Sequence, residues 1–378
     1  MTRTALVGAR ILAGGAWKDD HALILDADRI DAVLPTTQVP AGTARHVLAG
    51  GTLLPGFIDT QVNGGGGVLL NDAPTVDGVR AIAAAHRRFG TTGLLPTLIS
   101  DDLDKVAQAI AAVDAAIEAK VPGVLGIHLE GPFLNAQKRG IHDAAKFRRL
   151  DPDAVDLLAS SRRGKTLVTL APELCDAGLI TALVERGVIV AAGHTLATYE
   201  QMQAAFAEGL RGVTHLFNAM TQLESRSPGV VGAALESATC ISGIIADGHH
   251  VAPASLRVAL RTRGPSGLML VTDAMSSVGS SLTRFSLFGQ TITVADGALR
   301  GPEGQLAGSH LDMAGAVRNA VTMMGVDLAV ASRIASATPA TLLGIGDTRG
   351  IIAPGRKADL VHLDDEQQVT ATWIDGVR

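Results

Sequence analysis

Between about residues 53 and 273, short apolar runs of β type alternate with alanine-rich segments of helical type. The apolar runs are LLPGFIDTQ (53–61), GLLPTLIS (93–100), VLGIHLE (124–130), TLVTLAPE (166–173), VIVAAGH (188–194), GVTHLF (212–217), CISGIIAD (240–247) and LMLVTD (268–273). Continuous apolar runs predict parallel strands that are buried on both faces. Eight repeats of strand and helix favour an α/β fold of the closed (β/α)8, or TIM barrel, type over an open doubly wound sheet.

The two ends of the chain have a different pattern. Residues 1–52 contain short strand-like runs separated by Gly and Pro, and no long helical period. The last segment, 351–378, is again strand-like, so we expect it to pair with residues 1–52 in one small β domain. The predicted division is therefore 1–52 and 351–378 for the β domain and 53–350 for the barrel. Within the barrel part, FSLFGQTITVADGALRG predicts a hairpin after the eighth strand, followed by two helical stretches.

Composition limits the partners and the compartment. The chain has 378 residues, a net charge of −5 and only 3% aromatic residues, so its core must be aliphatic. The charges are interspersed and form no basic stripe, which argues against nucleic acid as a partner. No uncharged apolar stretch reaches the roughly 18 residues that span a membrane. The N-terminus lacks the pattern of a signal peptide, and Cys175 and Cys240 are too few for a disulfide scaffold, so we expect a cytoplasmic protein.

Four of the predicted strands end at, or lead directly into, a residue that can bind a metal or move a proton. These residues are Glu130, His194, His215 and Asp273. The carboxyl ends of barrel strands are where TIM barrels carry their chemistry. Two imidazoles and two carboxylates at such positions indicate a metal-dependent hydrolase. The simpler interpretation is a satisfied polar residue at the barrel mouth and, for Asp273, a helix N-cap.

The motifs in this order resemble one family in particular. They are LLPGFIDTQVNG, HLEGPF, the Gly140–His142 loop, AAGHT, THLFNAM, ADGHH, VTDAM, LAGS and PGRKADLV, and they span nearly the whole chain. The chain is similar to the N-acetylglucosamine-6-phosphate deacetylases of the amidohydrolase superfamily. The resemblance implies a barrel with a β-sandwich formed by both termini, usually as a homodimer. It also implies hydrolysis of the acetamide of N-acetylglucosamine 6-phosphate to glucosamine 6-phosphate and acetate.

The resemblance implies that Glu130, His194 and His215 bind a metal. Three protein ligands with one open position are typical of catalytic Zn²⁺, although Fe²⁺, Co²⁺ or Mn²⁺ also suits the set. Relatives carry His-x-His or His-x-Asn after the first strand, whereas this chain has Gln61 and Asn63. The fourth strand also lacks a lysine that could be carbamylated to bridge two ions. Both departures predict one divalent ion per chain, with Gln61 contacting the water at the metal or lying one layer farther out.

Two residues are expected to act directly on the substrate. Asp273 is the predicted general base, which then protonates the leaving amine as general acid. By resemblance, His142 donates a hydrogen bond to the substrate carbonyl and shares its developing negative charge with the metal. The alternative for His142 is a solvated loop histidine.

The resemblance also supplies the substrate contacts. Arg226 in ESRSPG is the predicted phosphate ligand, and in relatives the equivalent arginine reaches across the dimer interface. His250 is the stronger contact of the loop after strand seven, with His249 as its support. The other implied contacts are Gln61, Asn63, Ile141, Asn218, Ala219, Asp247, Gly248, Leu306, Ala307 and Gly308. The glycine run 64–67 lacks the spacing of a phosphate loop and is predicted to be a flexible loop.

Three other functions remain open on the sequence. The same chemistry on N-acetylgalactosamine 6-phosphate differs only in the orientation of one hydroxyl. An N-acyl-amino-acid deacylase is a second alternative, which Arg226 and the His250 loop disfavour because they suit a phosphate. A catalytically dead scaffold is the third, and the retention of Glu130, His194, His215 and Asp273 argues against it.

Overall fold

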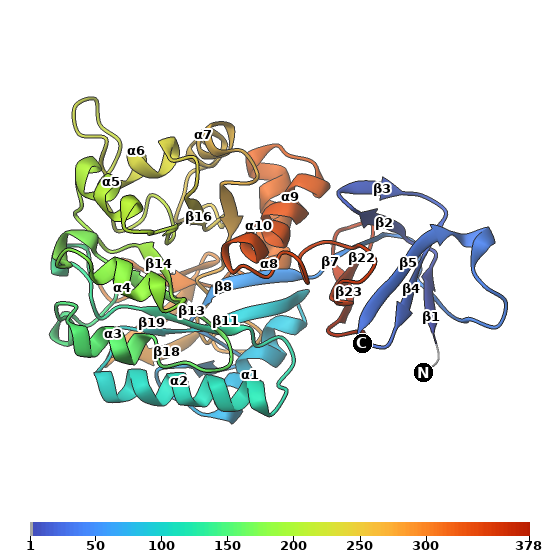
Figure 1. Cartoon of the computed structure of the whole chain (residues 1–378), viewed down its shortest axis with the longest axis horizontal. Helices are drawn as coiled ribbons and strands as arrows, with labels where there is room; N and C mark the ends of the chain where they lie inside the picture. The colour runs from blue at the N-terminus through green and yellow to red at the C-terminus, as the bar shows by residue number, and fades with distance from the viewer. Residues whose placement is uncertain (1–2) are drawn as a thin grey trace.

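The computed structural model describes residues 3–378 and shows a large, helix-covered sheet with a small β domain at its side (Figure 1). The large sheet is parallel, in the spatial order β17-β16-β15-β14-β13-β12-β11-β8. Its strands are β8 (Phe57–Val62), β11 (Thr91–Ile99), β12 (Gly126–Glu130), β13 (Lys165–Leu170), β14 (Ile189–Ala192), β15 (Gly212–Val213), β16 (Ile241–Ile244) and β17 (Leu268–Leu270). Each strand overlaps one of the eight apolar runs, so the predicted (β/α)8 barrel class is confirmed.

The two edge strands of this sheet, β8 and β17, meet along a sparse seam. Val62 forms an isolated parallel bridge with Ala274, just after β17. The N–H of Asp273 donates to the carbonyl of Gln61 at 3.0 Å. The barrel is therefore nearly closed, and Asp273 is one of the residues whose backbone joins its two edges.

Helices cover the outside of the barrel, and α1, α3, α5, α8 and α9 begin at a residue whose side chain caps the helix. Thr75 accepts the N–H of Gly78 at the start of α1, and Thr198 forms a capping box with Gln201 at the start of α5. The helices are α1 (Val76–Arg87), α2 (Leu103–Glu118), α3 (Pro152–Leu158), α4 (Leu179–Glu185), α5 (Tyr199–Ala207), α6 (Gly229–Glu236), α7 (Pro253–Arg263), α8 (Met313–Asn319), α9 (Leu328–Ala335) and α10 (Ala337–Leu342). Their inner faces pack on the sheet through aliphatic side chains such as Ile82, Val113 and Leu183, as the composition required. None of the described helices has the length and apolar character needed to cross a membrane.

The small domain is a sandwich of two sheets, whose strands come from residues 4–55 and 360–373 and lie together at one side of the molecule in Figure 1. One sheet contains β1 (Thr4–Val7), β4 (His21–Asp26), β5 (Arg29–Pro35) and β6 (Ala44–Val47). The other contains β2 (Arg10–Ala13), β3 (Ala16–Lys18), β7 (Thr52–Pro55), β22 (Leu360–Leu363) and β23 (Val369–Trp373). Leu6, Leu23, Leu53 and Leu360 share the core between them. The run 53–61 thus serves both units, because β7 lies in the sandwich and β8 begins the barrel.

A four-stranded antiparallel sheet follows the last barrel strand, and the predicted hairpin is part of it. Its strands are β18 (Arg284–Leu287), β19 (Gln290–Ala295), β20 (Ala298–Arg300) and β21 (Leu306–Ser309). Ser309 forms a parallel bridge with Ala274, which attaches this sheet beside the seam of the barrel.

The glycine run 64–67 was predicted as a flexible loop, and this prediction was wrong. Its residues begin a tight hairpin of β9 (Gly64–Gly65) and β10 (Val68–Leu69). Gly64 and Gly65 are buried, and a Cβ on Gly64 would lie 2.3 Å from the carbonyl oxygen of Val68. The glycines therefore permit close backbone approach.

Gly126 at the start of β12 provides a test of this packing. Its φ is +156°, and a Cβ there would lie 1.9 Å from the carbonyl oxygen of Lys165 on β13. We expect Gly126→Ala to lower the free energy of unfolding by roughly 2–5 kcal/mol, from overpacking and backbone strain together. The matched control is Gly178→Ala, since Gly178 has a φ of +84° but no atom within 4 Å of its added Cβ. Thermal unfolding of both variants would contradict this account if their melting temperatures fell equally.

Candidate active site

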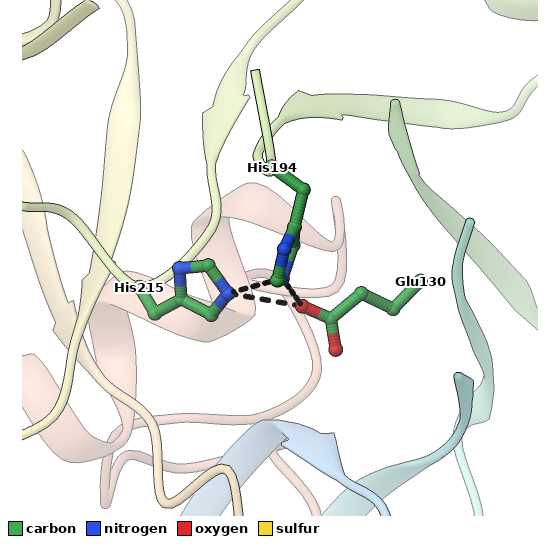
Figure 2. A group of neighbouring side chains, drawn as sticks. All are labelled: Glu130, His194 and His215. Atoms are coloured by element: carbon green, nitrogen blue, oxygen red, sulfur yellow. Dashed lines mark hydrogen bonds and ion pairs between the residues drawn. The ribbon is translucent and has the colours of Figure 1, made fainter. Parts of the chain in front are cut away.

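Three side chains from the ends of three barrel strands converge at the barrel mouth. Glu130 ends β12, and His194 and His215 follow β14 and β15 by two residues. Glu130 Oε1 lies 3.2 Å from His194 Nε2 and 3.0 Å from His215 Nε2, and the two Nε2 atoms are 3.0 Å apart. Figure 2 shows the two rings and the carboxylate pointing toward one another. All three residues are buried, so these atoms form one compact donor set.

The backbone around this donor set is held in an uncommon conformation. His194, His215 and Asp273 have positive φ values of 49°, 32° and 54°. Such values cost non-glycine residues about 1–3 kcal/mol each and persist where the surroundings fix them. Each of these residues lies two or three positions after the end of its strand, where the change in backbone direction turns its side chain toward the barrel mouth.

The hydrogen bonds of His194 show which of its two ring nitrogens faces the other site residues. Its Nδ1 lies 2.7 Å from the carbonyl oxygen of Lys138, so Nδ1–H donates there and Nε2 is the nitrogen that faces Glu130 and is available to a cation. Burial alone would raise the pKa of Glu130, but the two imidazoles outweigh burial and hold that pKa well below its usual range. The carboxylate oxygen and the two Nε2 atoms all lie within 4.8 Å of one another, so together they could hold a cation. The donor set fits a divalent metal such as Zn²⁺.

Asp273 lies beside this cluster and is oriented by two amides. Its Oδ1 accepts hydrogen bonds from Gln61 Nε2 at 3.1 Å and from Asn63 Nδ2 at 2.7 Å. Burial, and then the charge of Glu130, raises its pKa to about 6. The alternative as a helix N-cap is wrong, because no helix follows Asp273 before residue 284.

Gln61 connects the two carboxylates of the site. Its Nε2 donates to Glu130 Oε2 and to Asp273 Oδ1, both at 3.1 Å. The side-chain amide of Gln61 therefore occupies the space between the two carboxylates. A second cation at this place would need those carboxylate oxygen atoms free to bind it. Gln61 was expected either to contact the water at the metal or to lie one layer farther out. Its hydrogen bonds to Glu130 and Asp273 favour the second position, in which it orients these two carboxylates.

His142 is buried above the cluster, and its tautomer follows from its contacts. The ring centroid lies 4.5 Å from that of His194. Its Nδ1 accepts the backbone N–H of Ser100 at 3.3 Å and lies 2.8 Å from Ser100 Oγ. Because Nδ1 accepts, the proton resides on Nε2. Burial and the neighbouring His194 lower the pKa of His142 to about 3, so the ring is a neutral N–H donor and not the solvated loop histidine of the alternative.

The loop after β16 carries a second carboxylate–imidazole pair. Asp247 Oδ1 accepts the backbone N–H groups of His249 and His250, each at 2.8 Å, and Oδ2 lies 2.6 Å from His250 Nδ1. Burial opposes ionisation of Asp247, but His250 and these N–H donors lower its pKa overall. The support of His250 is therefore Asp247, whereas His249 is exposed, as is Gly248.

The remaining predicted contacts occupy the rim in different ways. Asn218 and Ala219 follow His215, and the carbonyl of Ala219 accepts the N–H of Thr195 at 3.1 Å. Gly308 on β21 has a φ of +62°, and a Cβ there would meet Met275 and the carbonyl of Asp273 at 2.6 and 2.9 Å. Leu306 and Ala307 precede it on the same strand, and Ile141 packs against the apolar cluster beneath that sheet.

Arg226 lies apart from the Glu130–His194–His215 cluster in the single chain. It is exposed on the loop before α6, where it lines an open groove with Lys138, Tyr199 and Gln222. Within residues 3–378, no hydrogen bond or ion pair joins Arg226 to the Glu130–His194–His215 cluster.

Two residues outside the recognised motifs, Glu173 and Ser100, also build the site. Glu173, just after β13, accepts hydrogen bonds from Asn135 Nδ2 at 2.9 Å, from the N–H of Leu196 at 2.7 Å and from the hydroxyl of Thr195. It thus connects the loops on either side of His194. A carboxylate at the end of a fourth buried strand, in TLVTLAPE, was the available signal. Ser100, which holds His142, follows the second strand in the same way.

Comparison with known proteins gives consistent matches over the whole chain. Residues 52–378 match the description "Amidohydrolase family" and residues 4–53 match "NagA composite domain". A Shewanella sp. (strain ANA-3) protein named N-acetylgalactosamine-6-phosphate deacetylase is 44% identical over 375 residues, which are 98% of this chain and 94% of that protein. A Homo sapiens protein named N-acetylglucosamine-6-phosphate deacetylase is 39% identical over 349 residues, 88% of this chain and 84% of that one. The crystal structure of N-acetylglucosamine-6-phosphate deacetylase from Pasteurella multocida has a TM-score of 0.96 at 34% identity, covering 99% of this chain and 98% of that one.

Proposed function

Because the chain belongs to the amidohydrolase family, we propose that it hydrolyses the N-acetyl group of an amino-sugar 6-phosphate, with N-acetyl-D-glucosamine 6-phosphate as the first candidate. The products would be D-glucosamine 6-phosphate and acetate, as in amino-sugar catabolism. The observation that carries the proposal is the meeting of Glu130, His194 and His215 beside a buried Asp273. These groups are the parts that amide hydrolysis at a metal requires.

In this proposal Glu130, His194 and His215 hold the cation, which when bound polarises the acetyl carbonyl and acidifies a water molecule. Asp273, kept in place by Gln61 and Asn63, removes a proton from the attacking water. It then delivers that proton to the leaving nitrogen. A raised pKa suits both halves of this exchange, because the group must accept and release a proton near neutral pH.

His142 supports the same step from the other side of the carbonyl. Its neutral Nε2–H donates to the acetyl oxygen as negative charge develops there. A buried donor fixed by Ser100 needs no reorganisation during the reaction. His250, held by Asp247, is proposed to bind the sugar together with Asn218, Ala219 and the Leu306–Gly308 strand.

The metal is proposed to be one Zn²⁺ per chain, with Fe²⁺, Co²⁺ or Mn²⁺ as substitutes that the same ligands accept. N-acetylgalactosamine 6-phosphate is the second candidate substrate, favoured by the 44% identity to a relative named for that activity. We further propose a cytoplasmic homodimer in which Arg226 of one subunit completes the phosphate site of the other. Its exposure and its separation from the cluster in the single chain support this arrangement.

The decisive experiment measures acetate release from both sugar phosphates, with and without a chelator. Comparison of kcat/KM on the two substrates identifies the preferred epimer. Absence of acetate release from either substrate by the metal-replete enzyme would reject the proposed function.

One bound ion per chain is expected on metal analysis of the purified protein. Gln61 lies between Glu130 and Asp273, and the only lysine of β13, Lys165, is at the amino end of that strand, away from the metal ligands. Two stoichiometric ions would therefore contradict the single-metal site. His215→Ala should lose the ion and the activity together, while the circular dichroism spectrum stays unchanged. Thr338→Val, a buried change in α10, is the matched control that should retain the metal.

Asp273→Asn should keep the metal and most of the substrate affinity but lower kcat by roughly 10²–10⁴-fold, the range for a removed acid–base group. Steady-state kinetics and metal content on the same preparation check this. An asparagine variant that turns over at nearly the wild-type rate would exclude Asp273 as the base.

The role of Asp273 as general base also predicts how kcat/KM changes with pH. Asp273 must be ionised to act as a base, so kcat/KM should fall as the pH decreases through its pKa of about 6. A bound cation favours the carboxylate, which places this acidic limb at or below that pH. The residual activity of Asp273→Asn should lack the limb.

Arg226→Ala should lower kcat/KM on the phosphorylated sugar by about 10- to 150-fold, the scale of one lost charge-assisted contact. The metal should remain bound, and the unphosphorylated sugar should be a poor substrate for both proteins. If Arg226 acts across a dimer, mixing Arg226→Ala chains with His194→Ala chains should restore part of the activity. Equal turnover of phosphorylated and free sugar by the wild type would contradict the phosphate assignment.

A further inference from the structure

Three polar residues alternate along the inner face of β8 and the residue after it. They are Asp59, Gln61 and Asn63, and their spacing of two places their side chains on the same face of the strand. Gln61 and Asn63 bind the carboxylate of Asp273. Asp59 instead binds Thr272, the residue directly before Asp273. The whole polar face of β8 is thus directed at two consecutive residues of the eighth strand end.

The carboxylate of Asp59 is fully buried and fully used. Its Oδ2 accepts the hydroxyl of Thr272 at 2.5 Å, and its Oδ1 accepts the backbone N–H groups of Gln61 and Thr272 at 3.2 and 3.3 Å. Burial raises the pKa of this carboxyl to about 7, which reflects the cost of placing a carboxylate in the interior. Every hydrogen bond that Asp59 makes is to β8 itself or to Thr272. Burying this carboxylate costs free energy, and its contacts join β8 to Thr272. Asp59 therefore fixes the position of β8 relative to the end of the eighth strand.

The contacts of Thr272 explain why this position matters. The seam between β8 and β17 has only a sparse backbone ladder, and Asp273 has a φ of +54° within it. Thr272 is held from both sides, because Asp59 accepts its N–H and its hydroxyl while Ser309 Oγ donates to its carbonyl at 2.5 Å. The N–H of Asp273 is held by Gln61 and its carbonyl by Ser309. A residue in such a strained conformation keeps its geometry only while its neighbours are fixed.

We propose that Asp59 and Thr272 form a clamp that positions Asp273 for proton transfer. The clamp rests on the proposed function, in which Asp273 is the acid–base group. Neither member contacts the metal ligands, so both are positioning residues. Loss of the Thr272 hydroxyl would let the start of the 272–273 turn shift, while Glu130, His194 and His215 remain on other strands.

The test removes one hydroxyl with little change in volume. Thr272→Val should lower kcat by about 10- to 100-fold, the effect of a small misplacement of a reacting group. Metal content should be unchanged and KM should change little. Thr272→Ser keeps the hydroxyl and should restore most of the rate. Thr338→Val is the matched control, since it also deletes a buried hydroxyl bond, to Pro265, but lies in α10.

A double-mutant cycle separates positioning from general destabilisation. In an Asp273→Asn background, Thr272→Val should change kcat by less than about twofold, because the group that it positions is already inactive. An undiminished effect in that background, or a loss of rate in proportion to loss of metal, would overturn the clamp. Wild-type kcat in Thr272→Val would do the same.

A second variant and the activity of the wild-type enzyme separate a failure of the clamp from other outcomes. Thr272→Ala enters the same cycle if the valine variant does not fold, with the same expected and opposing outcomes. Failure of the wild-type enzyme to release acetate rejects the proposed function, whereas a normal rate in the Thr272 variants of an active enzyme rejects only the clamp.

Discussion

The closure of eight parallel strands places their carboxyl ends on one rim, and the site depends on this constraint. β12, β14, β15 and β17 are separated by up to about 140 residues of sequence, yet Glu130, His194, His215 and Asp273 meet at the same mouth. The barrel brings them together without any local sequence signal that links them. The positive φ values at His194, His215 and Asp273 show how each strand end is bent to aim its side chain across the opening.

The site buries two carboxylates close together, and their surroundings shift the two pKa values in opposite directions. Glu130 faces two imidazoles, and its pKa is held well below the usual range. Asp273 accepts hydrogen bonds from two amides, and burial together with the charge of Glu130 raises its pKa to about 6. Pairs of titratable groups whose pKa values are driven apart mark a division of roles. Here the low-pKa group suits a metal ligand and the high-pKa group suits proton transfer.

Hydrogen bonds to residues outside the donor set orient the other side chains of the site. Lys138 and Ser100 fix the tautomers of His194 and His142, and Glu173 joins the loops around His194. Gln61 occupies the space between the two carboxylates, which explains how a chain without the first-strand histidines keeps one ordered site. These contacts come from loops on different strands, so the site is stiff only when the whole rim is assembled.

The sequence by itself determined the fold class, because eight continuous apolar runs are needed only where strands are buried on both faces. It also determined which residues stand at strand ends, and motif resemblance identified the donor set. It did not predict the buried glycine hairpin at 64–67, the pairing of His250 with Asp247, or the contacts of Glu173. Only the tertiary structure decided these, because they depend on which loops lie side by side once the barrel closes. Asp59 shows the same limit: in FIDTQVN its alternation with Gln61 and Asn63 is visible, but that the three meet Thr272 and Asp273 follows from the contact of the first strand with the eighth.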